Sequence, residues 1–317
     1  MGAAATYRDF AACSGCSVCR LVCPMWRARR DPRYSAEGLA KAQQGGASAA
    51  ELASVLAACT LCGACEPACP ENIALVDMVA GLRDEIGPPP DLAVLQVGHA
   101  QAAADAAPPP PGALLLAGAA LRADPALFER CSQLLGLAAA ADDGADIALA
   151  LEAGADVPAQ RARGFLAVLD GRSLVVGDGL LLRWLRASLP GARLQGMGEA
   201  LGHVAAIRRR IASADFYVIE PRAFHADHAR LVVHYDSLRR ETGCAMNLDL
   251  QRIDVPPRAE GYSALRMGWS AVDQAQAAWM LQGSRPARLL VENVAERELL
   301  RRVTGVPVLH LTELAEG

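Results

Sequence analysis

Residues 13–24 read CSGCSVCRLVCP and residues 59–70 read CTLCGACEPACP, which are two copies of one pattern. In each copy three cysteines stand three residues apart, a fourth follows four residues later, and a proline comes next. This spacing is typical of the loops that hold [4Fe–4S] clusters in bacterial proteins, because a short turning loop can place three thiolates at three corners of a cubane. Two complete copies favour iron over paired zinc knuckles, which need only one or two Cys-x-x-Cys pairs.

The fourth cysteine of each run lies on the segment that follows the loop, and we expect it to point away from that loop. In two-cluster ferredoxins this cysteine binds the other cluster. The sequence therefore predicts two crossed ligand sets, with one cluster on Cys13, Cys16, Cys19 and Cys69 and the other on Cys59, Cys62, Cys65 and Cys23.

The segments around the runs have helical patterns. Residues 36–43 have helical composition, and apolar residues recur at helical spacing in residues 49–58 and 73–82. A proline after the fourth cysteine is well placed to open a helix in each copy. These patterns predict a helical ferredoxin domain over residues 1–87, in place of the compact form built on β-hairpins.

Residues 8–87 resemble the helical two-cluster domain of the iron–sulfur subunit of glycolate oxidase. Similar domains occur in lactate-utilisation proteins, in the small subunit of heterodisulfide reductase and in succinate dehydrogenase iron–sulfur subunits. The matching residues are the two cysteine runs and the segments 23–28 and 70–73. The resemblance implies an electron-transfer subunit in a hetero-oligomeric complex. It would relay single electrons between a flavoprotein dehydrogenase, which carries FAD or FMN, and an electron-transfer flavoprotein, a quinone or a ferredoxin.

Beyond residue 87 the composition changes twice. Residues 88–111 are rich in proline and alanine, which predicts an extended linker. From residue 112 short apolar runs, including residues 114–116 and 147–151, alternate with helical patterns and predict parallel sheets. The order of these patterns recurs, so we expect two α/β repeats over residues 112–210 and 211–317. The predicted fold class is α+β multidomain, with a helical ferredoxin domain followed by a duplicated α/β module.

The order of elements in this α/β module resembles that of the Cys-Cys-Gly module, which the same families carry and which is named for its sequence motif. The cluster-binding cysteines are missing. Gly118 and Pro221 stand where cysteines are expected after a first strand, and residues 177–179 and 292–294 stand where a Cys-x-x-Cys would lie. We expect a degenerate module without a third cluster. Two alternatives stay open, namely a scaffold that docks a flavoprotein and an enzyme similar to heterodisulfide reductase.

Charge and hydropathy argue against nucleic acid as a general partner and against a membrane-spanning segment. The net charge of −4 and the pI of about 5.9 argue against a general nucleic-acid-binding protein. The longest apolar stretches, such as residues 112–120, are too short to span a membrane, and the N-terminus lacks the apolar run of a secretory signal. We expect a cytoplasmic protein, with attachment to the inner face of the membrane only through partners. Its thiols would stay reduced there.

The other chemically distinctive residues favour structural roles. No nucleophile, general base or phosphate loop is evident, so we predict no catalytic residue in this chain. Cys131 and Cys244 are expected to be small buried apolar residues. The pair His225 and His228 could bind a metal, but a polar helix surface is favoured. A basic cluster after the first run is either a solvated helix face or a site that steers an acidic flavoprotein or an anionic head group toward one iron–sulfur centre. It consists of Arg27, Arg29, Arg30 and Arg33.

Overall fold

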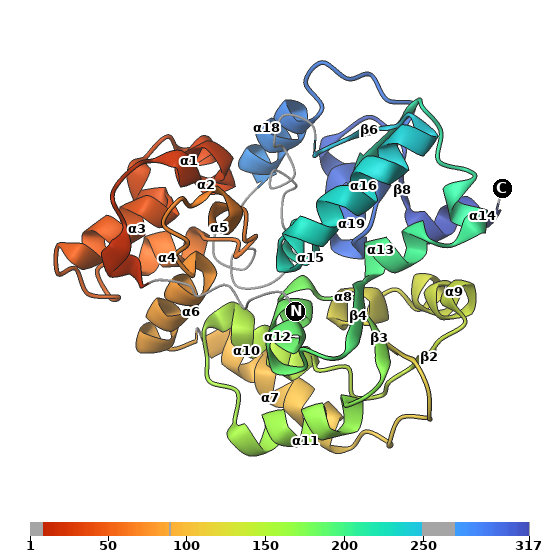
Figure 1. The fold of residues 1–317 in the computed structure, drawn as a ribbon, viewed down its shortest axis with the longest axis horizontal. Helices are drawn as coiled ribbons and strands as arrows, with labels where there is room; N and C mark the ends of the chain where they lie inside the picture. The colour runs from red at the N-terminus through yellow and green to blue at the C-terminus, as the bar shows by residue number, and fades with distance from the viewer. Residues whose placement is uncertain (1–8, 89, 249–269, 317) are drawn as a thin grey trace.

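The computed structural model describes residues 9–88, 90–248 and 270–316. The N-terminal part is helical and lies beside two α/β units (Figure 1). The helices of this part are α1 (Val18–Val22), α2 (Pro24–Arg29), α3 (Ala36–Gln44), α4 (Ala53–Ala58), α5 (Cys65–Ala68) and α6 (Leu75–Ile86). A short 3-10 helix, Phe10–Ala12, precedes these helices, and another, Pro32–Tyr34, lies between the second and the third.

Local sequence explains where these helices begin. Pro24 is the first residue of α2, where its missing N–H costs no hydrogen bond. The Ser35 hydroxyl accepts a hydrogen bond from the N–H of Gly38 (3.0 Å) and so caps α3. The prediction that each Cys-Pro opens a helix was wrong for the second copy. There Asn72 adopts a left-handed conformation (φ 52°), and α6 begins only at Leu75.

The extended linker predicted for residues 88–111 was wrong over most of its length. Helix α7 (Pro90–Ala104) occupies it and packs against α10 (Ala145–Ala153) (Figure 1). No proline occurs between residues 91 and 104, and this stretch is rich in alanine, a strong helix former. Leu92 is buried in a cluster with Ala57 and Ala153, so the helix ties the ferredoxin domain to the first α/β unit.

Two four-stranded parallel sheets occur in the described residues that follow α7. Their strand orders, β2-β1-β3-β4 and β6-β5-β7-β8, are the same, as expected of a duplicated module. The first sheet consists of β1 (Leu114–Leu116), β2 (Ala138–Ala139), β3 (Ser173–Val176) and β4 (Arg193–Gly196). The second consists of β5 (Asp215–Val218), β6 (Ala245–Met246), β7 (Arg288–Val291) and β8 (Val308–His310). The strand predicted at residues 147–151 was wrong, because this run lies in α10.

Helices connect and cover the strands of both sheets. In the first unit they are α8 (Ala119–Arg122), α9 (Pro125–Leu135), α10, α11 (Ala159–Leu169), α12 (Gly179–Ser188), α13 (Met197–Gly202) and α14 (Ala205–Arg208). In the second they are α15 (Pro221–Ala226), α16 (His228–Thr242), α18 (Ser270–Met280), α19 (Val294–Val303) and a final 3-10 helix, Leu311–Glu316. Among the described residues no helix is long and apolar enough to cross a membrane.

The two sheets share a core because strand side chains alternate between faces. Leu115 and Val175 of the first sheet lie in one buried cluster with Tyr217 and Leu290 of the second. The neighbouring residues of the same strands point the other way, into separate cores under the outer helices. The two α/β units therefore pack on each other through apolar surface, and the ferredoxin domain lies beside them (Figure 1).

Candidate metal centre

The eight cysteines of the two runs line two separate cavities. One cavity is lined by Cys13, Cys16, Cys19 and Cys69. The other is lined by Cys59, Cys62, Cys65 and Cys23. Each cavity thus takes three cysteines from one loop and the fourth from the other run. The fold brings together the same two groups of residues that the sequence predicts as crossed ligand sets.

The two cysteine loops share one backbone path. In the first loop Gly15 (φ 80°) and Ser17 (φ 65°) are left-handed, and in the second Leu61 (φ 51°) and Gly63 (φ 80°) are left-handed. In both loops these are the second and fourth residues after the first cysteine. Turns of this kind make concave backbone surfaces that bind anions, including iron–sulfur clusters. The repeated conformation indicates that both loops are shaped around the same kind of group.

The environment of the thiols suits a positively charged metal. Burial raises the pKa of Cys19 to about 11, and burial likewise raises the pKa of Cys23 and Cys65. Such thiols stay protonated at neutral pH unless a cation lies beside them, and iron supplies that charge. Cys59, Cys62 and Cys65 of the other run lie near Cys23. The donor set therefore fits two clusters, each with four thiolates.

Within residues 9–88, 90–248 and 270–316, no three His, Cys, Asp or Glu side chains are close enough to surround one ion. A cubane carries its four thiolates on separate iron corners, so it takes sulfur atoms that stand farther apart than the ligands of one ion.

The second loop is held by buried cations from distant parts of the chain. Arg83 of α6 donates hydrogen bonds to the carbonyl oxygens of Leu56 (2.7 Å) and Cys59 (2.5 Å). Arg222 of α15 donates two more to the carbonyl oxygen of Thr60 (3.0 and 2.7 Å), and it forms a buried ion pair with Glu152. The positive charges of two guanidinium groups therefore lie against the backbone of this loop.

A histidine from the second α/β unit also packs against this loop. A Cβ atom on Gly63 would lie 2.8 Å from the Cβ of His225, so only glycine fits there. The interpretation of His225 and His228 as a polar helix surface was wrong for His225, because its ring is half-buried and its Nδ1 lies 2.7 Å from the Pro221 carbonyl oxygen. No sequence pattern links Arg83, Arg222 or His225 to the cysteines, since their contacts span up to 162 positions.

The first loop lies at the surface instead. Cys16 is exposed, and the carbonyl oxygen of Cys13 accepts hydrogen bonds from Lys41 (2.7 Å) and Gln44 (3.0 Å). Helix α1, which follows this loop, exposes Val18 and Leu21. The two loops thus differ in access, because the first faces solvent and the second is covered by the α/β module.

The basic cluster after the first run makes internal contacts. The guanidinium group of Arg27 lies 3.8 Å from the centre of the Trp279 ring, and those of Arg29 and Arg30 lie over Tyr34 and Trp26. Arg33 forms an ion pair with Asp31 (2.6 Å). Cys131 and Cys244 are buried in the shared core of the sheets, in the environment expected of small apolar residues.

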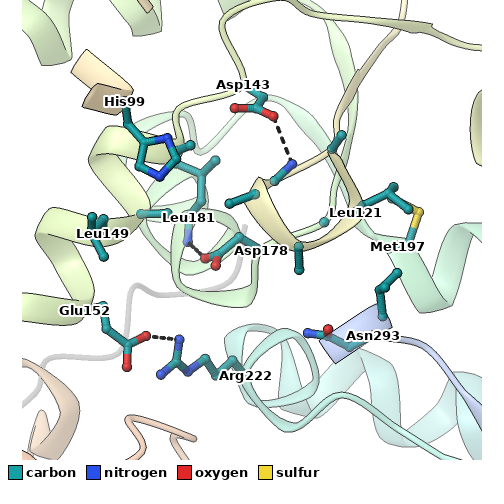
Figure 2. A pocket seen from close by; sticks show the side chains of 18 of the residues that line it. His99, Leu121, Asp143, Leu149, Glu152, Asp178, Leu181, Met197, Arg222 and Asn293 are labelled. Carbon is teal, nitrogen blue, oxygen red and sulfur yellow. Dashed lines mark hydrogen bonds and ion pairs between the residues drawn. The ribbon is translucent and has the colours of Figure 1, made fainter. Parts of the chain in front are cut away.

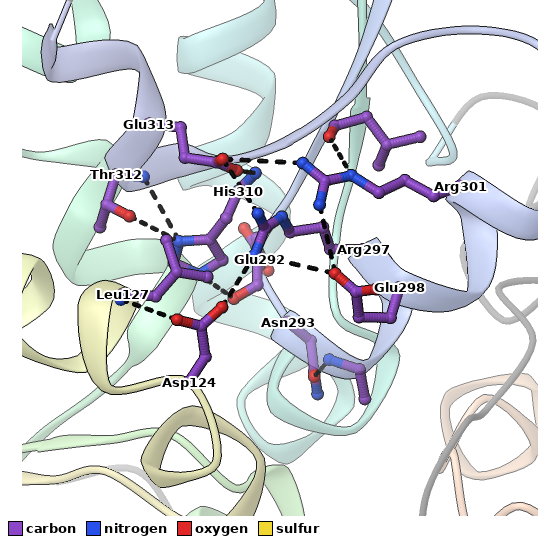
Figure 3. A network of polar contacts seen from close by, with 12 residues as sticks. Asp124, Leu127, Glu292, Asn293, Arg297, Glu298, Arg301, His310, Thr312 and Glu313 are labelled. Carbon is purple, nitrogen blue, oxygen red and sulfur yellow. Dashed lines mark hydrogen bonds and ion pairs between the residues drawn. The ribbon is translucent and has the colours of Figure 1, made fainter.

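A polar network closes the second sheet and joins the two repeats (Figure 3). His310 Nε2 donates to the Glu292 carbonyl oxygen (3.1 Å), and burial lowers the pKa of His310 to about 4, so Nδ1 is free to accept from the Thr312 hydroxyl (2.9 Å). Arg297 donates to Asp124 of the first repeat (3.0 Å) and to Glu313 (3.1 Å).

The Glu292 carboxyl group is buried at the end of β7. It accepts hydrogen bonds from the Tyr217 hydroxyl (2.8 Å), the Tyr235 hydroxyl (2.7 Å) and the Glu220 N–H (2.8 Å). Burial nevertheless raises the pKa of Glu292 to about 7. The folded state therefore binds the proton of Glu292 more tightly than the unfolded state does. Protonated Glu292 adds its full share to the free energy of unfolding below the ordinary pKa of a glutamate. This contribution is lost as the pH rises through 7.

Replacing Glu292 by glutamine should remove this pH dependence. Between pH 5 and pH 8 we expect the unfolding free energy of Glu292→Gln, relative to the parent protein, to rise by about 2 kcal/mol. Denaturant titration of both full chains at the two pH values measures their free energies of unfolding. The other titrating groups are common to both chains, so their effects cancel when the parent value is subtracted from that of the variant. An equal difference at pH 5 and pH 8 would show that Glu292 does not change its protonation over this range.

Comparison with known proteins identifies the N-terminal part of the chain. Residues 9–73 match the family model described as a 4Fe-4S dicluster domain. No curated protein and no solved structure matches the chain. The chain therefore contains an iron–sulfur domain of the ferredoxin kind, and this domain supports a role in electron transfer.

Proposed function

We propose that this chain is the electron-transfer subunit of a flavin-dependent oxidoreductase complex. It relays single electrons through two [4Fe–4S] clusters between a flavoprotein dehydrogenase and a downstream carrier, which is an electron-transfer flavoprotein, a quinone or a ferredoxin. The observation that carries the proposal is the division of eight cysteines between two cavities, each lined by residues of both runs. With one cluster in each cavity, both clusters would belong to one small domain, which supports the passage of electrons from one to the other.

The residues of the chain have separate roles in this relay. When bound, the clusters supply one-electron chemistry in which no substrate bond is made. The cysteines hold the clusters in the crossed sets, and the left-handed turns shape the loops around them. Arg83 and Arg222 fix the second loop through its carbonyl oxygens.

The exposed first loop is the proposed entry point for electrons. Cys16 lies at the surface, and the adjoining α1 presents Leu21, which is 65% exposed. An apolar side chain beside an exposed redox centre suits a flavoprotein that docks there, since apolar anchors carry much of the binding energy of interfaces. The second cluster, covered by the α/β module, would then pass electrons inward.

The scaffold alternative has support of its own. Arg183 of α12 forms an ion pair with Glu66 of the second cysteine run (2.6 Å), and Glu66 also accepts from the N–H of Val76 (3.0 Å). Together with Arg222, these contacts fix the ferredoxin domain on the α/β module. The module can serve as the scaffold of the relay, so the two functions are compatible. No comparable observation favours an enzyme similar to heterodisulfide reductase.

Docking of the flavoprotein can be tested at Leu21. We expect the full reconstituted chain to co-purify with a subunit that shows an FAD or FMN spectrum, and to be reduced by that subunit when its substrate is added. Leu21→Glu should weaken the association by about tenfold, which corresponds to about 1.4 kcal/mol. Val233→Glu is the matched control, because Val233 is also 65% exposed but lies on α16. Equal effects of the two variants, or a flavoprotein that cannot reduce the chain, would contradict the proposal.

A further inference from the structure

A cavity of about 270 Å³ lies at the carboxyl ends of the strands, between the two α/β units. Figure 2 shows side chains of both units around it, with Asp178 and Leu121 on one side and Asn293 on the other. Helix α7 covers it with Leu92 and His99. Its size is close to the lower end of small-molecule sites, and the carboxyl ends of parallel strands are where α/β folds bind ligands.

At the cavity the first repeat has small residues where the second repeat has large polar ones, of which Glu292 also lines the cavity. Gly118 and Gly177 follow β1 and β3, whereas Glu220 and Glu292 stand at the end of the matching strands β5 and β7. A Cβ atom on Gly177 would lie 2.1 Å from the carbonyl oxygen of Ala117, so no larger residue fits. The open space is therefore built into the backbone of the first repeat.

The polar groups of the wall disfavour an anionic ligand. Asp143 accepts from the Gly118 N–H (3.1 Å), and Asp178 caps α12 through the N–H groups of Leu180 and Leu181 (both 2.9 Å). The positive charge of Arg222 is already balanced by Glu152. Among the described lining residues, Arg222 is the one arginine and it is already paired with Glu152, so a phosphate or carboxylate would meet carboxylates and lose more solvation than it regained.

The rest of the wall is mostly apolar, although Glu292, Asn293, His310 and His99 also line the cavity. Leu121, Leu149, Leu181 and Met197 line the inside, and Leu95 lines the edge while 48% exposed. Helix α7 carries no Asp, Glu, Lys or Arg between residues 92 and 104. The chemistry suits a neutral, mainly apolar molecule with a few hydrogen-bonding atoms, whose apolar tail could leave past Leu95. His99 offers a ring nitrogen to such an atom.

One side chain connects this cavity to the second cysteine loop. Arg222 lines the cavity, and the same guanidinium group donates both hydrogen bonds to Thr60, which stands between Cys59 and Cys62. Thr60 in turn lines the cavity of the second cysteine group. A molecule held here would therefore be connected to the second cysteine group through Arg222 and Thr60.

We propose that this cavity binds the head group of a quinone, which takes electrons from the second cluster. This inference rests on the proposed relay and names its downstream carrier. The quinone gains two electrons and two protons to give the hydroquinone. The electrons come one at a time from the reduced cluster, which returns to its oxidised form each time. The protons come from solvent at the entrance, where His99 lies at the edge of the cavity.

Binding can be tested separately from electron transfer by titrating the reconstituted full chain with decylubiquinone in a calorimeter. We expect one site per chain. Ala119→Phe and Ala148→Phe, which fill the cavity from lining positions, should weaken binding by about tenfold or more. Ala167→Phe is the matched control, because Ala167 is exposed on α11 and does not line the cavity. Absence of binding, equal binding by all variants, or tighter binding of FMN than of the quinone would overturn the proposal.

Electron transfer is measured by mixing dithionite-reduced protein with decylubiquinone and following the visible absorption of the clusters. Ala119→Phe should slow reoxidation by the quinone by about tenfold, while reoxidation by ferricyanide, which does not need the cavity, stays unchanged. Equal slowing with both oxidants would overturn the quinone site but leave the relay intact. A chain that binds quinone but holds no iron would overturn the relay itself, so the two failures are distinguishable.

Discussion

Replacing Cys13 and Cys69 together with serine is expected to halve the iron content of the reconstituted protein, from about eight to about four atoms per chain. The two residues belong to different runs, 56 positions apart in the sequence, but they line the same cavity. Both substitutions should therefore damage one cluster and leave the other with its four ligands. Iron and acid-labile sulfide analysis, with EPR spectra of the reduced protein, measures the result.

The contrasting variant places both serines in one run. Cys13→Ser with Cys23→Ser removes one ligand from each cavity, so we expect both clusters to be lost or unstable and the iron to fall well below half. Cys131→Ser is the matched control, since this thiol is buried in the core of the α/β module. The reverse pattern, in which the variant within one run keeps half of the iron, would show that each run holds its own cluster.

Replacing Arg222 is expected to have the second large effect, on both the free energy of unfolding and the iron content. Arg222→Ala removes a buried cation, which leaves the carboxylate of Glu152 buried without this ion-pair partner and takes two hydrogen bonds from Thr60. Breaking one side of a buried ion pair costs about 3–5 kcal/mol. Denaturant unfolding of the full chain should show a loss of this size. Because Thr60 lies in the second cysteine loop, the variant should also lose iron from one of its two clusters.

Two further variants distinguish the loss of the Arg222–Glu152 ion pair from nonspecific destabilisation of the fold. Arg172→Ala is the matched control, because Arg172 donates to the carbonyl oxygen of Pro110 at an exposed site, and we expect a change within about 0.5 kcal/mol. In the double variant Arg222→Ala with Glu152→Ala, the free energy of unfolding should fall by less than the sum of the two single losses. The reason is that each single variant leaves the other charge buried without this ion-pair partner. Strictly additive losses would contradict a coupled pair.

The metal centre was predictable because its pattern is local. Four cysteines within eleven residues fix which thiols one loop can bring together, and the cavities group the cysteines as predicted. The parallel sheets were predictable for a similar reason, since apolar runs such as residues 114–116 alternate with helical patterns. The ligand assignment itself stays a prediction, which the serine variants test.

Local patterns failed where tertiary packing decides the structure. The run at residues 147–151 is apolar enough for either a buried strand or a buried helix, and packing against α7 makes it part of α10. The prolines at both ends of residues 88–111 favoured an extended linker, but the alanine-rich stretch between them contains no proline and forms α7. Arg83 and Arg222 reach the second loop only through the fold, so the sequence alone gives no sign of their contacts.

The central claim is that the first part of this chain holds two [4Fe–4S] clusters, and counting iron and sulfide in the full chain tests it most directly. After anaerobic reconstitution we expect about eight iron and about eight sulfide atoms per chain, and the reduced protein should give the EPR spectrum of two interacting clusters. A colourless protein that carries zinc and takes up no iron, or a protein that saturates at about four iron atoms, would contradict the account.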